Sequence, residues 1–281
     1  MIEEIFQEEK TWEEFFKETE ERDGWVFRGQ PDDDPLTTSL ERALNDYKIP
    51  LLDSPDIEKY MKRDFRRRYE GNDRNLVIDD TLYCLSLMRH HGAPTRLLDW
   101  TYSPYVAAFF AVEKIKLNTA MKNNFAIVYC LCQEWCKKMA EKNVKAKRIF
   151  QMRYTDNTMT DKSFCPLYMK NKYNFVLLDN PMSIHKRLFL HKGTFLIPGN
   201  IRISTMDNIK SMENWNNKKN IKKIKIRIKN KEEIEKIYSR LRLMNISNES
   251  LFPGLDGFSR SLKQNMFYYI ALSKNRAGKG N

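Results

Sequence analysis

The spacing of apolar and polar residues along the chain predicts several helices. Between residues 3 and 22, apolar side chains recur at helical intervals, including Trp12, Phe15 and Phe16, which is typical of an amphipathic helix. The segment "LTTSLERAL" starts another helix, with Thr38 or Ser39 as its cap. Further helices are predicted at residues 55–72, 79–91 and 103–116, from about residue 133, at residues 231–246, and at the end of the stretch 249–265.

Other segments have the composition of strands. Short apolar runs predict strands at residues 24–30, 95–100, 124–132 and 193–199. Residues 221–230, "IKKIKIRIKN", alternate isoleucine with cations, which indicates a half-buried strand with a basic outer face. Residues 146–180 show no clear period. The pattern as a whole predicts an α+β fold in one domain, with helices more numerous than strands.

Composition narrows the class of protein. Hydrophobic residues make up 41% of the 281 residues, enough for a real core. No run of 18 uncharged apolar residues occurs, which argues against a membrane span. The acidic, amphipathic start is unlike a secretory signal, and five cysteines do not suggest a disulfide framework. We therefore expect a soluble, cytoplasmic protein.

The chain carries a net charge of +12, which favours encounter with polyanions such as RNA, DNA or nucleotides. The alternative is a basic but uninvolved solvated surface. The lysines of residues 221–229 have two interpretations, one with a nucleic-acid ligand and one without. They form an RNA-binding face, or they protect an edge strand from aggregation.

Arg28 is the first candidate for chemistry, because it ends an apolar strand beside Gly29. A planar guanidinium suits a phosphate, and a neighbouring glycine would let a ligand approach the backbone closely. The alternative is an ion pair between Arg28 and one of the acids at residues 32–34.

A second candidate site lies where the predicted strand around Asp99 turns into the helix beginning near Ser103. Helix N-termini favour anions, and Arg96, Asp99 and Thr101 lie close to this corner in the sequence. Arg96 and Asp99 are also three residues apart and could instead form a buried ion pair.

The sequence gives little evidence for a metal site or for a glycine-rich nucleotide-binding motif. Cys130, Cys132 and Cys136 have no second ligand pair at zinc spacing, so core cysteines are the favoured interpretation and no metal is expected. His90 and His91 are adjacent and cannot easily share one ion, but an imidazole can act as a base near neutral pH. No P-loop and no Rossmann glycine pattern occurs.

Four stretches together resemble the FRG domain family of bacteria. They are "WVFRGQ", "RHHGAPTRLLDWTYSPYVAAFFA", "RLFLHKGTFLIPG" and "LFPGLDGFSRSL", in the expected order over roughly residues 12 to 264. The family's usual Gln-His-Tyr-Gly is replaced here by Arg89 to Gly92, and its Gln-x-Gly-x-Phe begins here with His191. We expect an FRG domain over residues 1–270, with a helical N-terminal part (1–90), a sheet-bearing core (91–270), and a flexible tail at 271–281.

The FRG pattern more distantly resembles ADP-ribosyltransferases of the Arg-Ser-Glu type, which implies a split β-sheet core surrounded by helices and NAD as substrate. The resemblance places Arg28 on the ribose or pyrophosphate and Thr101 in a supporting role. The family's Glu-x-Glu is missing from "HKGTFLIPG". Asp99 or Asp256 would have to supply that charge, or His191 would orient the ribose.

The resemblance implies catalytic roles for Arg28, His90 and Asp99. It implies cofactor contacts from a second set: Arg28, Gly29, Gln30, Arg96, Thr101 and His191. The leading hypothesis is an NAD-dependent transferase acting as a toxin or phage-defence effector, with RNA as the favoured target. The alternative is a non-catalytic nucleic-acid or nucleotide-binding module, and a nuclease using His90, His91 and Asp99 ranks last. An antitoxin or chaperone is a candidate partner.

Overall fold

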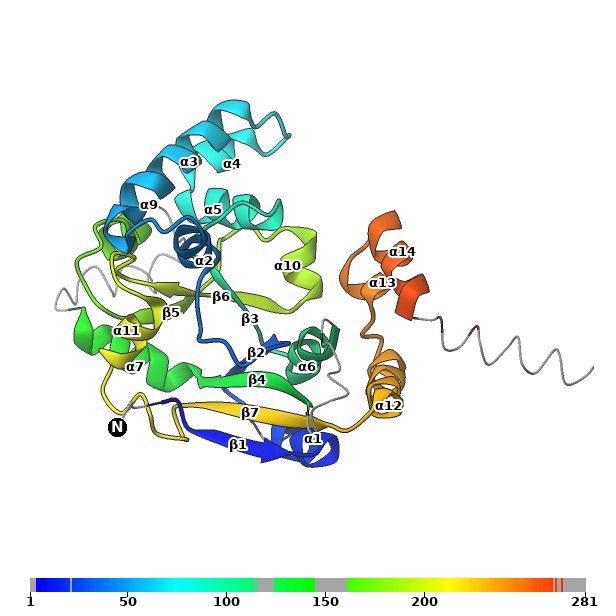
Figure 1. Cartoon of the computed structure of the whole chain (residues 1–281). Helices are drawn as coiled ribbons and strands as arrows, with labels where there is room; N and C mark the ends of the chain where they lie inside the picture. Colours follow the sequence, from blue (N-terminus) through cyan, green and yellow to red (C-terminus); the bar gives the residue numbers. More distant parts are fainter. Residues whose placement is uncertain are drawn as a thin grey trace, which may run out of the picture. The chain divides into compact units, whose positions relative to one another are not determined.

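The computed structural model describes residues 4–20, 22–113, 115, 124–144, 161–264, 266 and 269 of the chain. They belong to two compact units, residues 1–229 and residues 230–281. The first unit contains a seven-stranded mixed sheet with helices packed around it, so the predicted α+β class is confirmed (Figure 1).

The sheet has the strand order β1-β7-β4-β2-β3-β6-β5. Its strands are β1 (Gln7–Lys10), β2 (Trp25–Gln30), β3 (Leu98–Thr101), β4 (Asn124–Cys132), β5 (Val176–Asp179), β6 (Gly193–Pro198) and β7 (Ile221–Ile228). All neighbouring pairs are antiparallel except β1 and β7, which are parallel. Between β2 and β3 only Phe27 and Thr101 are paired, so the four strands on one side and the three on the other join through a single bridge.

The helices of the first unit fall between these strands. They are α1 (Trp12–Glu20), α2 (Ser39–Asp46), η1 (Leu51–Asp53), α3 (Ser54–Arg68), α4 (Arg74–Asp79), α5 (Thr81–His90), α6 (Pro104–Glu113), α7 (Gln133–Asn143), α9 (Asp161–Phe164), η2 (Cys165–Met169), α10 (Lys186–Leu190) and α11 (Thr205–Lys210). Of the two cap candidates for α2, Thr38 is the one used, and its hydroxyl accepts from the Glu41 amide at 3.1 Å. At the predicted start of α6, the Ser103 hydroxyl accepts from the Val106 amide at 3.3 Å. No helix in the described part of the chain has the length and apolar character needed to cross a bilayer.

The N-terminus departs from the predicted single helix over residues 3–22. Residues 7–10 form β1, and the helix begins only at Trp12, after Thr11, whose hydroxyl accepts from the Glu14 amide at 3.3 Å. The reason is tertiary, because the backbone groups of β1 pair with those of β7, more than 200 residues away. Together with β2, this strand means that the N-terminal part contributes to the sheet as well as to the helical layer.

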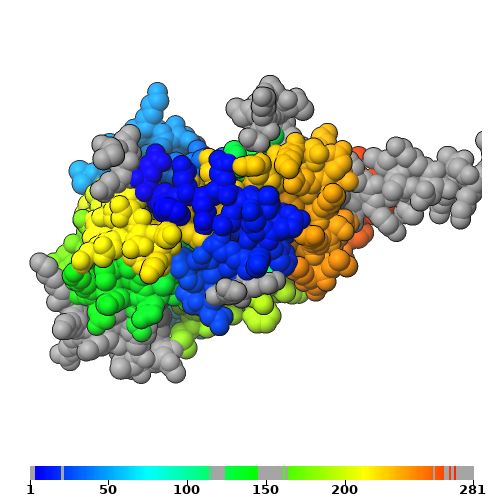
Figure 2. All heavy atoms as spheres, turned by 90° about the horizontal axis from the view of Figure 1, so that it is seen from below, coloured from blue at the N-terminus to red at the C-terminus, as the bar shows by residue number. Residues whose placement is uncertain are grey.

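β7 therefore lies inside the sheet, between β1 and β4, and the edge-strand interpretation of its lysines is wrong. Its cations are paired with acids from the N-terminal segment. Lys222 contacts Glu8 and Glu18, Lys223 and Lys225 both contact Asp33, and Arg227 contacts Glu9. In the view from below, the blue N-terminal segment lies next to the yellow segment that precedes β7 (Figure 2).

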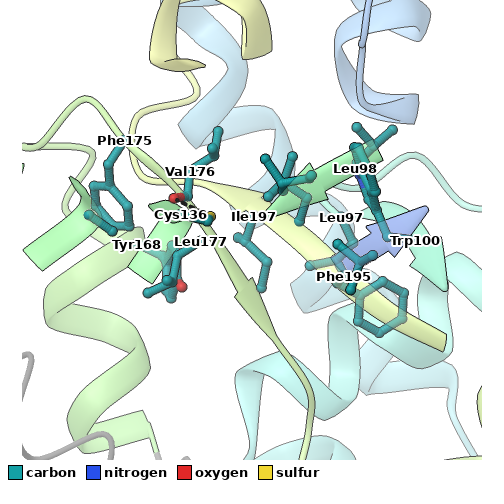
Figure 3. Close-up of a cluster of buried hydrophobic side chains, with 14 of the residues drawn as sticks. Leu97, Leu98, Trp100, Cys136, Tyr168, Phe175, Val176, Leu177, Phe195 and Ile197 are labelled. Carbon is teal, nitrogen blue, oxygen red and sulfur yellow. Dashed lines mark hydrogen bonds between the residues drawn. The ribbon is translucent and has the colours of Figure 1, made fainter. Parts of the chain in front are cut away.

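The core of the first unit lies between the sheet and its helices. Figure 3 shows part of it, with Trp100 of β3 and with Phe195 and Ile197 of β6 among the buried side chains, and with Phe175 near Tyr168. Within this apolar interior lies one fully buried ion pair. Arg96 Nη2 lies 2.5 Å from Glu58 Oε2, and both side chains have no exposed surface. Arg96 Nη1 also donates to the Tyr168 carbonyl at 2.7 Å.

The second unit contains α12 (Lys231–Leu243), α13 (Asn248–Leu251) and α14 (Leu255–Gln264). These helices agree with the apolar pattern of residues 231–265. Asn230 caps α12 by accepting from the Glu233 amide at 3.0 Å. Asp256, one of the acids considered as a replacement for the missing glutamates, lies in α14 of this unit.

Candidate functional site

Arg28 lies on β2 at the point where β2 and β3 part. Its Nε donates to Gln30 Oε1 at 3.1 Å, and its Nη1 donates to the backbone carbonyl of Asp99 at 2.7 Å. Both acceptors are neutral, and within the described chain no carboxylate lies within ion-pair distance of the guanidinium. The expected alternative of a pair with residues 32–34 is wrong for Asp33, which instead contacts Lys223 and Lys225. Arg28 is therefore fixed in direction by neutral groups and forms no direct ion pair with a described carboxylate.

Asp99 is the acid whose charge acts most strongly on this guanidinium. Its Oδ2 accepts two hydrogen bonds from Arg89, at 2.6 Å from Nη2 and 3.0 Å from Nε, and 47% of its side chain is exposed. Burial opposes ionisation, but the charges of Arg89 and Arg28 outweigh it and hold the pKa of Asp99 below its ordinary value. Asp99 is thus an ionised, partly open carboxylate with its second oxygen uncommitted to Arg89.

Arginines converge on this single acid. Burial, together with the nearby charges of Arg42 and Arg89, lowers the pKa of Arg28 to about 10, although the charge of Asp99 acts in the opposite direction. The pKa of Arg42 is lowered by burial and then by Arg89, while Arg187 acts on Asp99. We call Arg28, Arg42, Arg89 and Arg187 the arginine cluster. Four cations around one carboxylate repel one another, and a bound anion would relieve that repulsion.

Three histidines adjoin the cluster. The ring of His90 lies 4.7 Å from that of His185 and 4.9 Å from that of His91, measured between centroids. Burial lowers the pKa of His90, and the charges of His91 and Arg187 add to this effect. Burial, His90 and Arg187 together lower the pKa of His185 to about 4. At neutral pH, His90 and His185 are therefore neutral imidazoles that can accept a proton. His90 Nδ1 is also buried with no hydrogen-bond partner in the described structure.

This environment predicts a loss of stability on mild acidification. The folded-state pKa of His185 lies near 4, below its ordinary value of 6.5, so the unfolded chain takes up a proton first as the pH falls. The contribution is fully present above pH 6.5 and is lost progressively between pH 6.5 and about 4. His185→Asn should reduce this loss while keeping a side chain able to cap α10, where His185 Nδ1 accepts from the Leu188 amide at 3.2 Å.

The measurement is urea unfolding of both proteins at pH 7 and pH 5. The wild-type chain should lose more of its free energy of unfolding than the variant does. Equal losses would show that His185 does not titrate as the structure implies.

Thr101 and His191 are joined at the end of β3. The Thr101 hydroxyl donates to the His191 carbonyl at 2.7 Å and accepts from the Ser103 amide at 3.0 Å. The His191 ring packs edge-on against Phe110 of α6, with centroids 5.2 Å apart. Both residues thus hold the corner that joins β3 to α6 and to the turn before β6. They were expected to contact a cofactor, and the contacts seen are structural.

Three other expected cofactor residues, Arg96, Gly29 and Gln30, have mainly structural contacts. Arg96 is sealed in its pair with Glu58, so neither a ligand contact nor the alternative pair with Asp99 describes it. Gly29 does not leave open space for a ligand, because a Cβ there would lie 1.8 Å from the Ala107 carbonyl oxygen of α6. The glycine serves the close approach of α6 to β2. Gln30 is buried and orients Arg28 while donating to the Asp34 carbonyl at 2.9 Å.

The metal candidates do not assemble. Cys130 and Cys136 are buried, Cys132 is partly buried, and the Cys136 thiol lies 3.4 Å from the Val176 carbonyl oxygen. Across the described ranges of the chain, no group of three or more His, Cys, Asp or Glu side chains gathers in a way that could hold a metal ion.

The structure therefore brings together four of the expected site residues, Arg28, Gln30, Asp99 and His90, through contacts or shared electrostatics. Four further members were not predicted: Arg42, Arg89, His185 and Arg187. Arg89 adjoins His90 in a stretch already rich in ionisable groups, which was a usable signal. The others come from α2 and from the start of α10, and their proximity depends on tertiary packing.

Comparison with known proteins finds one match for this chain. The family model of the FRG domain matches residues 23–120, a range that contains Arg28, Arg42, Arg89, His90 and Asp99. No curated protein and no solved structure matches the chain. The arginine and histidine residues of α10 lie outside the matched range. Over residues 23–120 the chain is therefore similar to the FRG domain family, which supports the resemblance seen in the sequence.

Proposed function

We propose that the chain is an NAD-dependent ADP-ribosyltransferase that modifies a macromolecule, with RNA the favoured acceptor. The observation that carries the proposal is the convergence of the arginine cluster on Asp99, next to histidines that are neutral at physiological pH. The negatively charged pyrophosphate of a dinucleotide would neutralise the positive charge of the arginines. The Asp99 carboxylate can hold its ribose. Activity of this kind would suit a bacterial toxin or phage-defence effector, restrained by an antitoxin or chaperone.

The residues present can supply each part of the transfer. Guanidiniums bind pyrophosphate oxygens in bidentate fashion, and Arg28 is already directed by Gln30 and the Asp99 carbonyl. The bond between ribose C1′ and nicotinamide nitrogen breaks, and its electron pair leaves with nicotinamide. Asp99 stabilises the positive charge that develops on the ribose. The acceptor oxygen or nitrogen then bonds to C1′, and its proton passes to His90 or His185.

Two features of the fold support the same proposal. The single bridge between β2 and β3 divides the sheet beside Arg28, as a split core would. The corner from Thr101 into α6 holds the end of β3 against the turn before β6. Both features lie where the resemblance to ADP-ribosyltransferases placed the substrate.

Arg28→Lys should lower nicotinamide release by roughly 100-fold or more, because lysine keeps the charge but not the planar fork. Asp99→Asn should have a similar effect by removing the negative charge at nearly constant shape. The matched control is Arg63→Lys, since Arg63 lies on α3 and contacts Asp64 at 3.2 Å. Nicotinamide release is measured by chromatography, and transfer by labelled NAD with total RNA and lysate.

Circular dichroism of each variant verifies folding. A folded wild-type protein that neither releases nicotinamide nor transfers label contradicts the proposal. Equal activity of Arg28→Lys and Arg63→Lys contradicts the role given to the cluster.

A second function is favoured by one observation, the absence of acidic residues from β6, whose sequence is Gly-Thr-Phe-Leu-Ile-Pro. In that case the chain is a non-catalytic nucleotide- or nucleic-acid-binding module. It would bind NAD or ADP-ribose through the arginine cluster, with affinity lost in Arg28→Lys, and would leave the glycosidic bond intact. Calorimetric titration combined with the nicotinamide assay separates the two functions.

A further inference from the structure

We propose that the turn through α10, together with the end of β3, binds single-stranded RNA. The surface consists of Tyr102, Lys186, Phe189 and Lys192, and we call it the α10 platform. The inference rests on the proposed function, because it names the acceptor-binding surface of that site. The lysines of β7, which the sequence left open as an RNA-binding face, are already matched by acids.

Backbone hydrogen bonds hold the two aromatic residues of the platform in one region. The Tyr102 amide donates to the Lys192 carbonyl at 2.9 Å, and the Lys192 amide donates to the Phe189 carbonyl at 3.0 Å. Phe189 is 67% exposed and Tyr102 is 43% exposed, which is unusual for aromatic side chains on a secured turn. Exposed rings held by backbone contacts are suited to stacking with bases.

The two lysines of the platform add charge that the protein does not neutralise. Lys186 and Lys192 are both exposed, and neither forms an ion pair with a described carboxylate. Lys223 and Lys225 differ, because each lies within 3.0 Å of an Asp33 oxygen. Exposed aromatics beside unpaired cations are the combination that tracks a single-stranded phosphate backbone while tolerating any base.

The platform adjoins the proposed reaction centre through α10 itself. His185 caps this helix, and Arg187 within it acts electrostatically on Asp99 and His90. Thr101, one residue before Tyr102, donates to the His191 carbonyl, one residue before Lys192. A strand of RNA stacked on Tyr102 and Phe189 would therefore lie next to the arginine cluster, where one of its nucleophilic groups can meet the ribose.

The test is fluorescence anisotropy with a labelled, unstructured RNA about 12 nucleotides long, without NAD, at salt concentrations from about 50 to about 200 mM. Tyr102→Ala/Phe189→Ala should weaken binding by at least about tenfold, the size expected for lost base stacking. Lys186→Ala/Lys192→Ala should reduce the slope of log affinity against log salt by about 1.4, the value for two phosphate contacts on a single strand.

The matched control is Lys223→Ala/Lys225→Ala, which removes the same formal charge from paired lysines and should leave both the affinity and the slope unchanged. Nicotinamide release to water should stay unchanged in the platform variants, and circular dichroism checks their folding. If the β7 control weakens binding as much as the platform variants do, binding follows net charge and the platform is overturned.

Failure of this inference and failure of the proposed function give different results. Nicotinamide release without RNA binding overturns the platform alone. RNA binding that depends on the platform, without nicotinamide release, supports the platform and contradicts the transferase. Platform variants that lose transfer to proteins but bind RNA as the wild type does would assign the surface to a protein acceptor and overturn the RNA proposal.

Discussion

Replacing Glu58 with leucine is expected to lower the free energy of unfolding by about 3–5 kcal/mol, the usual cost of leaving one member of a buried ion pair alone. The Arg96 guanidinium would remain charged in an interior where neither side chain has exposed surface. It would keep its bond to the Tyr168 carbonyl but lose every bond to Glu58. Urea unfolding followed by circular dichroism measures the loss.

A double variant, Glu58→Leu/Arg96→Met, distinguishes the charge from simple packing. Apolar replacement of a whole buried pair is often tolerated, so the double variant should be more stable than Glu58→Leu alone. If the double variant is still less stable than the wild type, the intact pair contributes net stability beyond relieving an isolated charge. If Glu58→Leu costs less than about 1 kcal/mol, the pair is not dry as described.

Replacing Gly29 with alanine is expected to destabilise the protein by more than about 3 kcal/mol, the upper end of ordinary overpacking. The added methyl group would lie 1.8 Å from the Ala107 carbonyl oxygen and 2.7 Å from the Ala111 amide nitrogen. Both are backbone atoms of α6, so no side chain can rotate away. Either α6 moves off β2 or the strand shifts, and both changes disturb the corner beside Arg28.

Gly24→Ala is the matched control. Gly24 has φ of 77° and nothing within 4 Å of an added Cβ, so its substitution should cost only about 1–2 kcal/mol of backbone strain. Thermal unfolding of the two variants should therefore differ clearly. Similar melting temperatures would mean that the contact between Gly29 and α6 relaxes at little cost.

Much of the fold could be predicted where local pattern and packing agree. The caps at Thr38 and Ser103, the apolar helix α6 and the buried strand β4 all follow from short-range rules. The first residues did not follow these rules, because their few apolar positions fit both a helix and a strand. For residues 7–10, pairing with β7, far along the chain, decided for the strand. Residues 146–180 lacked a clear period and no element was assigned between residues 180 and 193, so β5 and α10 were not predicted.

The candidate site was predictable only in part, for a related reason. Arg28 and Asp99 stand out because charged side chains interrupt apolar strands. Whether an arginine is free or sealed depends on its partner. Glu58, the partner of Arg96, lies 38 residues earlier, and no local spacing could separate the sealed Arg96 from Arg28, which forms no direct ion pair with a described carboxylate. Gly29 shows the same limit, because the sequence cannot tell whether a ligand or a helix occupies the space beside it.

The short strand β1 acts as an internal counterion for the rest of the sheet. Its glutamates, with those of α1, neutralise Lys222 and Arg227, while its backbone occupies the ladder of β7. Removing residues 4–10 would leave the backbone groups of β7 that pair with β1 without partners. It would also remove the β1 glutamates that pair with Lys222 and Arg227. Such a truncated protein would be prone to recruit strands from other molecules and to adsorb polyanions without specificity. Nucleic-acid binding by N-terminally shortened forms would therefore report this exposed ladder rather than the native surface.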